Sequence, residues 1–262
     1  MKTLLTFSIA SLFLLTNFVC QPLDIRKGMV QFDQAFLPVL MHTRQGDMNE
    51  AKKAVFYLDF QWQRLRNQYE FSRPEHEWRE AFRQINEHLG KAYQSIDANR
   101  PAPALGQLES VRQEWTNLRT RYRIDYYLDY LYDFQEAADL LTETATDEML
   151  CLQAWEDLEK MVAETAAAWQ EVRYYPLDAD LYELDAEKIE LLRARMQTVA
   201  AVVQNIEKAM ETADRAQVAA VCTRLQPAFL KVLWVFGNDN ASTTYYARNR
   251  AQMPDYHSFI QN

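Results

Sequence analysis

The sequence predicts an all-α protein made of two helical bundles. Gly and Pro are scarce, with five Gly and eight Pro in 262 residues, and residues 107–175 contain neither. Within that segment, apolar residues recur every three or four positions, which is the period of an amphipathic helix. The sustained alternation of apolar and polar residues that is typical of a half-buried strand is missing from the chain.

The first twenty residues have the pattern of an export signal. Lys2 precedes an apolar run from Leu4 to Val19, which is too short to span a bilayer comfortably as a helix. We therefore expect residues 1–20 to direct the protein out of the cytoplasm, to the periplasm or cell envelope. Cys20, directly after the run, is a candidate for lipidation, and simple secretion and an uncleaved anchor are the alternatives.

Local signals place three helices before residue 100. The first is expected to begin near Met29 and to end at Gly46. Asp47 and Glu50 have the spacing of a helix N-cap and its reciprocal partner, so a second helix begins there. Ser72 to Glu75 repeats that signal before a third helix, which we expect to end near residue 96.

A fourth helix is predicted over residues 104–141. At 1.5 Å per residue it would be about 57 Å long, more than one small bundle needs. We expect its first half to complete one bundle, residues 21–125, and its second half to complete another, residues 126–237. The two bundles would then share this long central helix.

Three further helices and a tail complete the prediction of about seven helices. They are expected at residues 147–173, 186–211 and 214–237, with an acidic loop before the second and Gly237 closing the last. Residues 238–262 are polar with scattered aromatics. We expect them to form a tail that lies on the body or is partly disordered.

Charge and cysteine content limit the partners. The formal net charge of −9 argues against nucleic acid, whose binders need basic surfaces. It also argues against anionic lipid, so membrane contact is expected only through a lipid anchor or the signal segment. If Cys20 is modified or removed, Cys151 and Cys222 are left as a disulfide or as two buried thiols.

The motifs of common catalytic sites are absent from the sequence. There is no Gly-x-Ser-x-Gly, no Gly-rich phosphate loop and no His-Glu-x-x-His. Helical metal sites usually place ligands three or four residues apart, and the four His show no such spacing. We therefore expect a protein that is not an enzyme and holds neither a metal nor another cofactor.

Paired helical bundles behind an export signal resemble periplasmic cytochromes of the four-helix type and other exported bundle proteins. The Cys-x-x-Cys-His attachment pattern of such cytochromes is absent, so the resemblance assigns no role to any residue. A haem held without covalent bonds needs no local motif, and His42, His88 and Met41 are the candidate ligands. A periplasmic carrier of haem or a metal is therefore the alternative function.

The most distinctive segment is an alternation of Asp and Tyr at residues 125–133. In a helix, Asp125, Asp129 and Asp133 would share one face, where like charges repel each other unless something compensates them. With Tyr126 and Tyr130 they form either a docking face, a cation site or a solvated crossover between the bundles. We interpret the chain as an exported binding or scaffold protein whose partner is another protein of the envelope.

Overall fold

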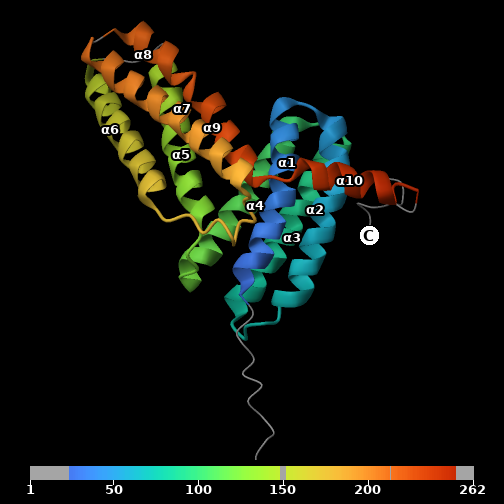
Figure 1. The fold of residues 1–262 in the computed structure, drawn as a ribbon. Helices are drawn as coiled ribbons and strands as arrows, with labels where there is room; N and C mark the ends of the chain where they lie inside the picture. Colours follow the sequence, from blue (N-terminus) through green and yellow to red (C-terminus); the bar gives the residue numbers. More distant parts are fainter. Residues whose placement is uncertain (1–23, 148–151, 213, 252–262) are drawn as a thin grey trace, which may run out of the picture.

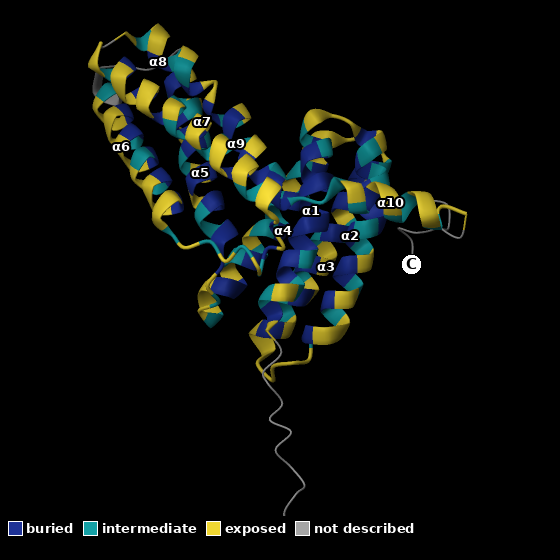
Figure 2. Ribbon diagram, viewed as in Figure 1, coloured by how far each residue is buried: buried dark blue, intermediate teal, exposed yellow. Residues whose placement is uncertain are grey.

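The computed structural model describes residues 24–147, 152–212 and 214–251. Every regular element in these ranges is a helix, so the predicted all-α class is confirmed. The helices form two bundles side by side (Figure 1). Buried residues line the interior of each bundle, and exposed residues cover the outer faces (Figure 2).

The first bundle contains four long helices, and its core is rich in aromatic rings. Phe32, Trp62, Phe82 and Trp115 are almost fully buried, and their ring centroids lie 5.7 to 6.3 Å apart where they contact each other. Such offset and edge-on contacts add to the burial of apolar area. The helices are α1 (Ile25–Gln45), α2 (Met48–Tyr69), α3 (His76–Asp97) and α4 (Pro101–Tyr122).

The second bundle consists of residues 127–236 and has a mixed aliphatic and aromatic core. Phe134 lies 4.7 Å from Trp169 and 5.1 Å from Phe229, measured between ring centroids. These three rings come from three different helices and hold the bundle together at its centre. The helices are α5 (Tyr127–Thr146), α6 (Leu152–Tyr174), α7 (Ala186–Glu211), α8 (Arg215–Cys222), α9 (Leu225–Leu233) and the short 3₁₀ helix η1 (Trp234–Phe236).

Several helix ends lie where local chemistry predicts them. The side chains of Asp47, Asp185 and Asp214 each accept backbone N–H groups of the helix that follows. Gly46 ends α1 with φ at 77°, a conformation that Gly adopts without a steric penalty. The predicted cap at Ser72 is not formed, and α3 begins at His76 without a side-chain cap.

The predicted shared helix over 104–141 is wrong, because the chain turns between α4 and α5. Arg123 takes the left-handed conformation with φ at 54°, and the N–H of Ile124 donates to the carbonyl of Arg119. The apolar period continues on both sides of this turn, so it gave no signal of a break. Tertiary contacts fix the turn, because Tyr126 donates to Asp33 on α1 and Asp129 pairs with Arg119.

The expected single helix over 214–237 is likewise divided, into α8, α9 and η1. Arg215–Phe236 is the one stretch among the described residues that is long and apolar enough to cross a membrane. Core helices of globular proteins can be equally long and apolar. Here the stretch supplies buried residues of the second bundle, among them Val218, Leu225 and Phe229.

The chain then returns to the first bundle, where α10 (Asp239–Asn249) crosses α1 and α2 (Figure 1). Pro38 lies inside α1 and has no N–H, so the carbonyl of Gln34 lacks its usual helical donor. The N–H of Asn238 donates to that carbonyl over 2.8 Å. The proline in α1 thus creates the acceptor that fixes the start of α10.

Candidate functional site

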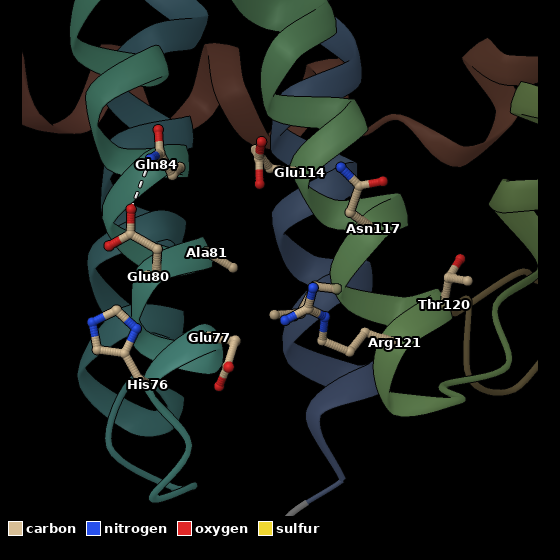
Figure 3. A pocket seen from close by; sticks show the side chains of 10 residues that line it. His76, Glu77, Glu80, Ala81, Gln84, Glu114, Asn117, Thr120 and Arg121 are labelled. Carbon is tan, nitrogen blue, oxygen red and sulfur yellow. Dashed lines mark hydrogen bonds between the residues drawn. The ribbon is translucent and has the colours of Figure 1, made fainter.

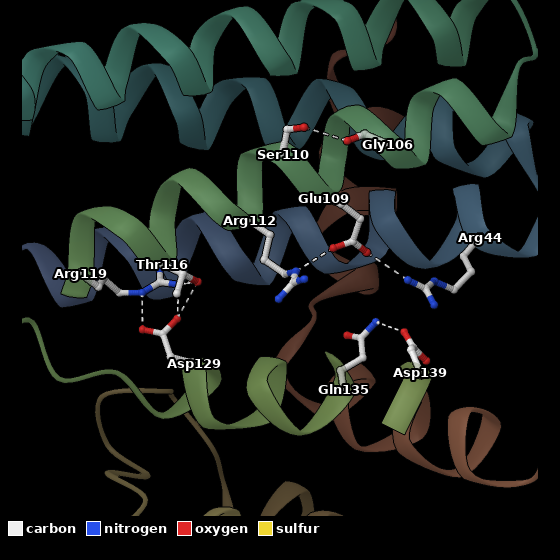
Figure 4. Close-up of polar contacts among 10 residues, drawn as sticks. All are labelled: Arg44, Gly106, Glu109, Ser110, Arg112, Thr116, Arg119, Asp129, Gln135 and Asp139. Atoms are coloured by element: carbon white, nitrogen blue, oxygen red, sulfur yellow. Dashed lines mark hydrogen bonds and ion pairs between the residues drawn. The ribbon is translucent and has the colours of Figure 1, made fainter. Parts of the chain in front are cut away.

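The predicted Asp and Tyr residues lie at the junction between the two bundles. Figure 4 shows Thr116 and Arg119 on α4 facing Asp129 on α5. The Nε of Arg119 donates to Oδ2 of Asp129 over 2.7 Å, and its Nη2 donates to Oδ1. The hydroxyl of Thr116 also donates to Oδ1, over 3.1 Å. This two-pronged ion pair joins α4 to α5 directly.

Arg119 is the most deeply buried charged residue of the junction, with 2% of its surface exposed. Burial lowers the pKa of its guanidinium, but the hydrogen bonds and charge of Asp129 more than offset this, so the pKa ends above its usual value. Arg119 therefore stays charged at every pH at which the protein is folded. Its central carbon also lies 4.5 Å from the centre of the Tyr126 ring.

Asp33 on α1 is the second acid of the junction, and it is buried in the core. The hydroxyl of Tyr126 donates to its Oδ2 over 2.6 Å. Burial raises the pKa of Asp33 to about 6, although the charge of Arg119 and the hydrogen bond from Tyr126 oppose the rise. Because Tyr126 immediately precedes α5, this bond fixes the turn between α4 and α5 onto α1.

The loop after α6 closes the same junction from the other side. The N–H of Tyr127 donates to the hydroxyl oxygen of Tyr182 over 2.9 Å. The amide of Gln34 contacts the carbonyl of Tyr182 at 3.5 Å and donates to Oε2 of Glu183 over 3.3 Å. Asp33 and Gln34, which are adjacent in α1, therefore hold the α4–α5 turn, the loop and the start of α10.

A second polar cluster lies nearer the start of α4 (Figure 4), and one of its residues contacts the second bundle. Glu109 accepts from Arg44 over 3.0 Å and from Arg112 over 2.7 Å, which links α1 to α4. The guanidinium of Arg112 also lies 4.8 Å from the centre of the Tyr132 ring on α5. The α4 side of the junction thus supplies cations, and the α5 side supplies acids and rings.

A pocket of about 340 Å³ opens at this junction, and it is the candidate functional site. Asp125 and Tyr130 lie at its edge, and the ring of Tyr130 stacks on that of Tyr175 with the centroids 4.0 Å apart. The pKa of Tyr175 is raised, first by its hydrogen bond to Asp125. The pocket is lined by Arg119, Thr120, Arg123, Ile124, Asp125, Tyr126, Asp129, Tyr130 and Asp133.

Asp133 is an exposed acid of this pocket, and among the described residues it takes part in no ion pair. Partial loss of solvent raises its pKa, and the charges of Asp129 and Glu136 raise it further. The wall of the pocket that α5 provides is therefore strongly negative. A cation placed there would be attracted by the carboxylates of Asp125 and Asp133, which form no ion pair within the described residues.

All five residues of the predicted face line the pocket, although they do not share one helical face. Asp125 precedes α5, and Tyr126 points into the core to reach Asp33. Asp129 has a structural role as the partner of Arg119, which leaves Asp125 and Asp133 as the accessible acids. The prediction that Asp125, Asp129 and Asp133 share one helical face is therefore wrong, because Asp125 lies outside α5.

Sequence reasoning did not predict the roles of three residues of the junction. Asp33 gave the clearest signal, because it is the one charged residue in the mostly apolar stretch from Met29 to Met41. Arg119 and Tyr182 gave none, since Arg and Tyr are common on exposed helices and in loops. Their importance follows only from the contacts that the fold brings together.

The candidate haem ligands are occupied with other contacts. The Nε2 of His42 lies 3.0 Å from Asp239 Oδ1, and its ring meets the Trp234 ring edge-on at 5.6 Å. The Nδ1 of His88 lies 2.9 Å from the side-chain oxygen of Gln107, and the candidate Met41 is buried in the core. Within the ranges that the structure describes, no three His, Cys, Asp or Glu residues form a group that could hold a metal.

Of the cysteines, only Cys222 lies within the described side chains. It is fully buried, and burial raises the pKa of its thiol to about 11. The predicted lipidation site Cys20 and the pairing of Cys151 with Cys222 involve residues outside the described part. Both stay predictions.

A larger groove of about 640 Å³ separates the outer faces of α3 and α4 (Figure 3). Glu77 and Glu80 project from α3, and Glu114 and Arg121 project from α4. Glu80 is already held by Arg83 and by the amide of Gln84. The junction pocket is the better candidate, because it brings together the buried Arg119 and the exposed acids Asp125 and Asp133, which form no ion pair within the described residues.

The two bundles differ sharply in charge. Residues 21–125 contain 14 Asp and Glu against 16 Lys and Arg, whereas residues 126–237 contain 21 Asp and Glu against 9 Lys and Arg. The negative charge of the whole chain therefore belongs to the second bundle. The junction pocket lies where the nearly neutral bundle meets the acidic one.

No family model, curated protein or solved structure matches the chain. Its function therefore has to be inferred from its own residues.

Proposed function

We propose that the protein is an exported binding or scaffold protein that holds a basic side chain of a partner protein in the junction pocket. The observation that carries this proposal is the position of Asp125 and Asp133. They are exposed acids on the wall of one pocket, and neither forms an ion pair within the described part of the chain. The stacked rings of Tyr130 and Tyr175 lie beside Asp125.

This combination suits an Arg or Lys side chain. Carboxylates form short, charge-assisted hydrogen bonds with a guanidinium or an ammonium group. The face of an aromatic ring attracts the same cations and covers their apolar stems. A bound cation would also relieve the repulsion that raises the pKa of Asp133.

The charge of the second bundle supports the same kind of partner. Residues 126–237 contain 21 acidic and 9 basic residues. The resulting negative electrostatic potential attracts basic surfaces before contact. The ion pair between Arg119 and Asp129 joins α4 to α5 behind the pocket. A partner would thus meet a preformed site, which lowers the entropic cost of binding.

The proposed location outside the cytoplasm depends on residues 1–20. Mass spectrometry of the mature protein tests it, because cleavage before or after Cys20 and acylation of that residue give different masses. A mature chain that still begins at Met1 in the cytoplasmic fraction would contradict export.

Binding can be tested with a labelled octa-arginine peptide and fluorescence anisotropy at two salt concentrations. We expect the double variant Asp125→Asn/Asp133→Asn to bind the peptide at least 10-fold more weakly than the native protein, because both acids of the pocket lose their charge. Asp129 is left unchanged in this variant, since it pairs with Arg119.

The matched control is Asp157→Asn/Glu207→Gln, which removes two exposed acids elsewhere on the second bundle. A pocket site predicts that this control loses much less affinity than the pocket variant. Equal losses in the two variants would show nonspecific attraction to the acidic bundle and would refute the pocket. An octa-glutamate peptide should not bind.

A further inference from the structure

Asp33 is the one fully buried acid at the joint between the bundles, and it faces charged or titratable groups from every element around it. Arg119 approaches from α4, and Tyr126 comes from the turn that follows. Asp129 and Tyr132 face it from α5, and Tyr182 faces it from the loop after α6. A change in the charge of Asp33 therefore reaches both bundles at once.

The joint gives this carboxyl group little compensation for its burial. Its hydrogen bond within the described structure is the one from Tyr126, at 2.6 Å. The nearby guanidinium of Arg119 directs its hydrogen bonds to Asp129 and not to Asp33. An ionised carboxylate in such a site loses much of its hydration without gaining a direct ion pair.

We propose that the joint between the two bundles is sensitive to protons through Asp33. A proton on Asp33 favours the closed joint, and ionisation of Asp33 favours an open joint in which water reaches the carboxylate. This inference goes beyond the proposed binding function, because it concerns the joint itself and needs no ligand.

The direction follows from linkage between proton binding and opening. In the open joint Asp33 would titrate near its ordinary value of 3.8, and in the closed joint it titrates at about 6. The closed state therefore holds its proton more tightly, so acid stabilises it; this stabilisation is complete below about pH 3.8 and is lost as the pH rises through about 6. The difference corresponds to a change of about 100-fold in the opening equilibrium.

Opening would also reshape the junction pocket. Tyr126 and Asp129 both line the pocket. Tyr126 donates to Asp33, and Asp129 forms the ion pair with Arg119, so both would move if the joint opened. Protonation of Asp33 alone would therefore raise the affinity of any ligand that binds only the closed pocket. Protonation of Asp133, whose pKa is raised by partial burial, would act in the opposite direction.

Amide hydrogen exchange tests the proposal in the free, full-length protein. The N–H groups of Tyr127 and Asn238 make hydrogen bonds across the joint, to Tyr182 and Gln34. We expect their protection, corrected for the intrinsic pH dependence of exchange, to fall by about 10-fold between pH 5.0 and pH 7.5, since the rest of the roughly 100-fold change lies below pH 5.0. Amides in the middle of α4, such as that of Leu108, should change much less.

The variant Asp33→Asn removes the titrating group and keeps a carbonyl oxygen for Tyr126. Its Tyr127 and Asn238 amides should show the same protection at both pH values. The matched control is Asp59→Asn on α2, since burial also raises the pKa of Asp59 but this residue lies away from the joint. That control should keep the pH dependence of the native protein.

A second measurement keeps the proposal open to refutation if Asp33→Asn does not fold. Carbon-13 NMR of the native protein follows the carboxyl carbon of Asp33 directly. Titration near pH 6, together with the loss of Tyr127 and Asn238 protection over the same range, supports the proposal. Titration near pH 4, or protection that does not change with pH, overturns it.

Discussion

Gly237 lies directly against Pro38, and a Cβ atom added to Gly237 would be 3.3 Å from Cδ of that proline and equally close to Cβ of Leu37. Both neighbours are rigid parts of α1, so neither can move aside easily. Gly237 is also the residue at which the chain leaves η1 and returns to the first bundle. The chain can pass this close to α1 on its way back to the first bundle only because residue 237 has no side chain.

We expect Gly237→Ala to destabilise the protein by about 1–2 kcal/mol, because the added methyl group overfills the contact with Pro38. Urea denaturation measures this change. Gly106→Ala is the control, since Gly106 lies inside α4 with open space around it. That substitution should instead stabilise the protein by up to about 1 kcal/mol.

Arg119→Met should destabilise the protein by about 3 kcal/mol, because it leaves Asp129 without its partner at a largely buried site. The double variant Arg119→Met/Asp129→Leu should recover part of this loss. Arg193→Met is the control, because Arg193 and Glu190 are both mostly exposed and such pairs contribute little. Equal effects of Arg119→Met and Arg193→Met in denaturation would contradict the buried ion pair.

Tyr126→Phe removes the hydroxyl that donates to Asp33, so the pKa of Asp33 should rise further above about 6. Above that pH the ionised carboxylate lacks its donor, and we expect a loss of about 1–2 kcal/mol at pH 7.5. At pH 5.0, where Asp33 is protonated in the folded state, the loss should be smaller. Tyr174→Phe, at an exposed position, should leave stability unchanged at both pH values.

The double variant Tyr245→Ala/Tyr246→Ala should expose an aromatic surface on α2. The ring of Tyr246 contacts Phe56, and that of Tyr245 contacts Phe60, with centroids 5.7 and 5.2 Å apart. Without these rings we expect increased fluorescence of the dye ANS, which binds exposed apolar surface. Arg248→Ala, an exposed change on the same helix, should not increase it.

The thiol of Cys222 should be unreactive in the folded protein. It is fully buried and burial raises its pKa to about 11, so both access and thiolate content are low at pH 8. In a variant that carries Cys20→Ser and Cys151→Ser, iodoacetamide should label Cys222 only after urea is added. Rapid labelling of the folded variant would contradict the burial of α8.

Local chemistry was enough to predict the fold class and many helix ends. The caps at Asp47, Asp185 and Asp214 bind backbone N–H groups two or three positions away, so the local sequence is enough to predict them. The left-handed Gly46 is of the same kind. Such features need no knowledge of the rest of the chain.

The turn between α4 and α5 could not be predicted in this way. Arg123 has no special propensity for a positive φ, and the apolar period runs through the turn without interruption. Asp33, which holds Tyr126 there, lies 93 positions away in the sequence. The Asp and Tyr residues of the candidate site are close together in the sequence and could be predicted, but Asp33, which binds Tyr126 from behind the pocket, is distant in the sequence and could not.

The first bundle is discontinuous along the chain, which matters for the order in which the protein is made. Its four long helices end at Tyr122, yet α10, which covers Phe56 and Phe60, begins only at Asp239. A growing chain therefore carries an uncovered aromatic surface until the whole second bundle has been synthesised. Folding of the first bundle is thus completed only by a helix that is made after the second bundle.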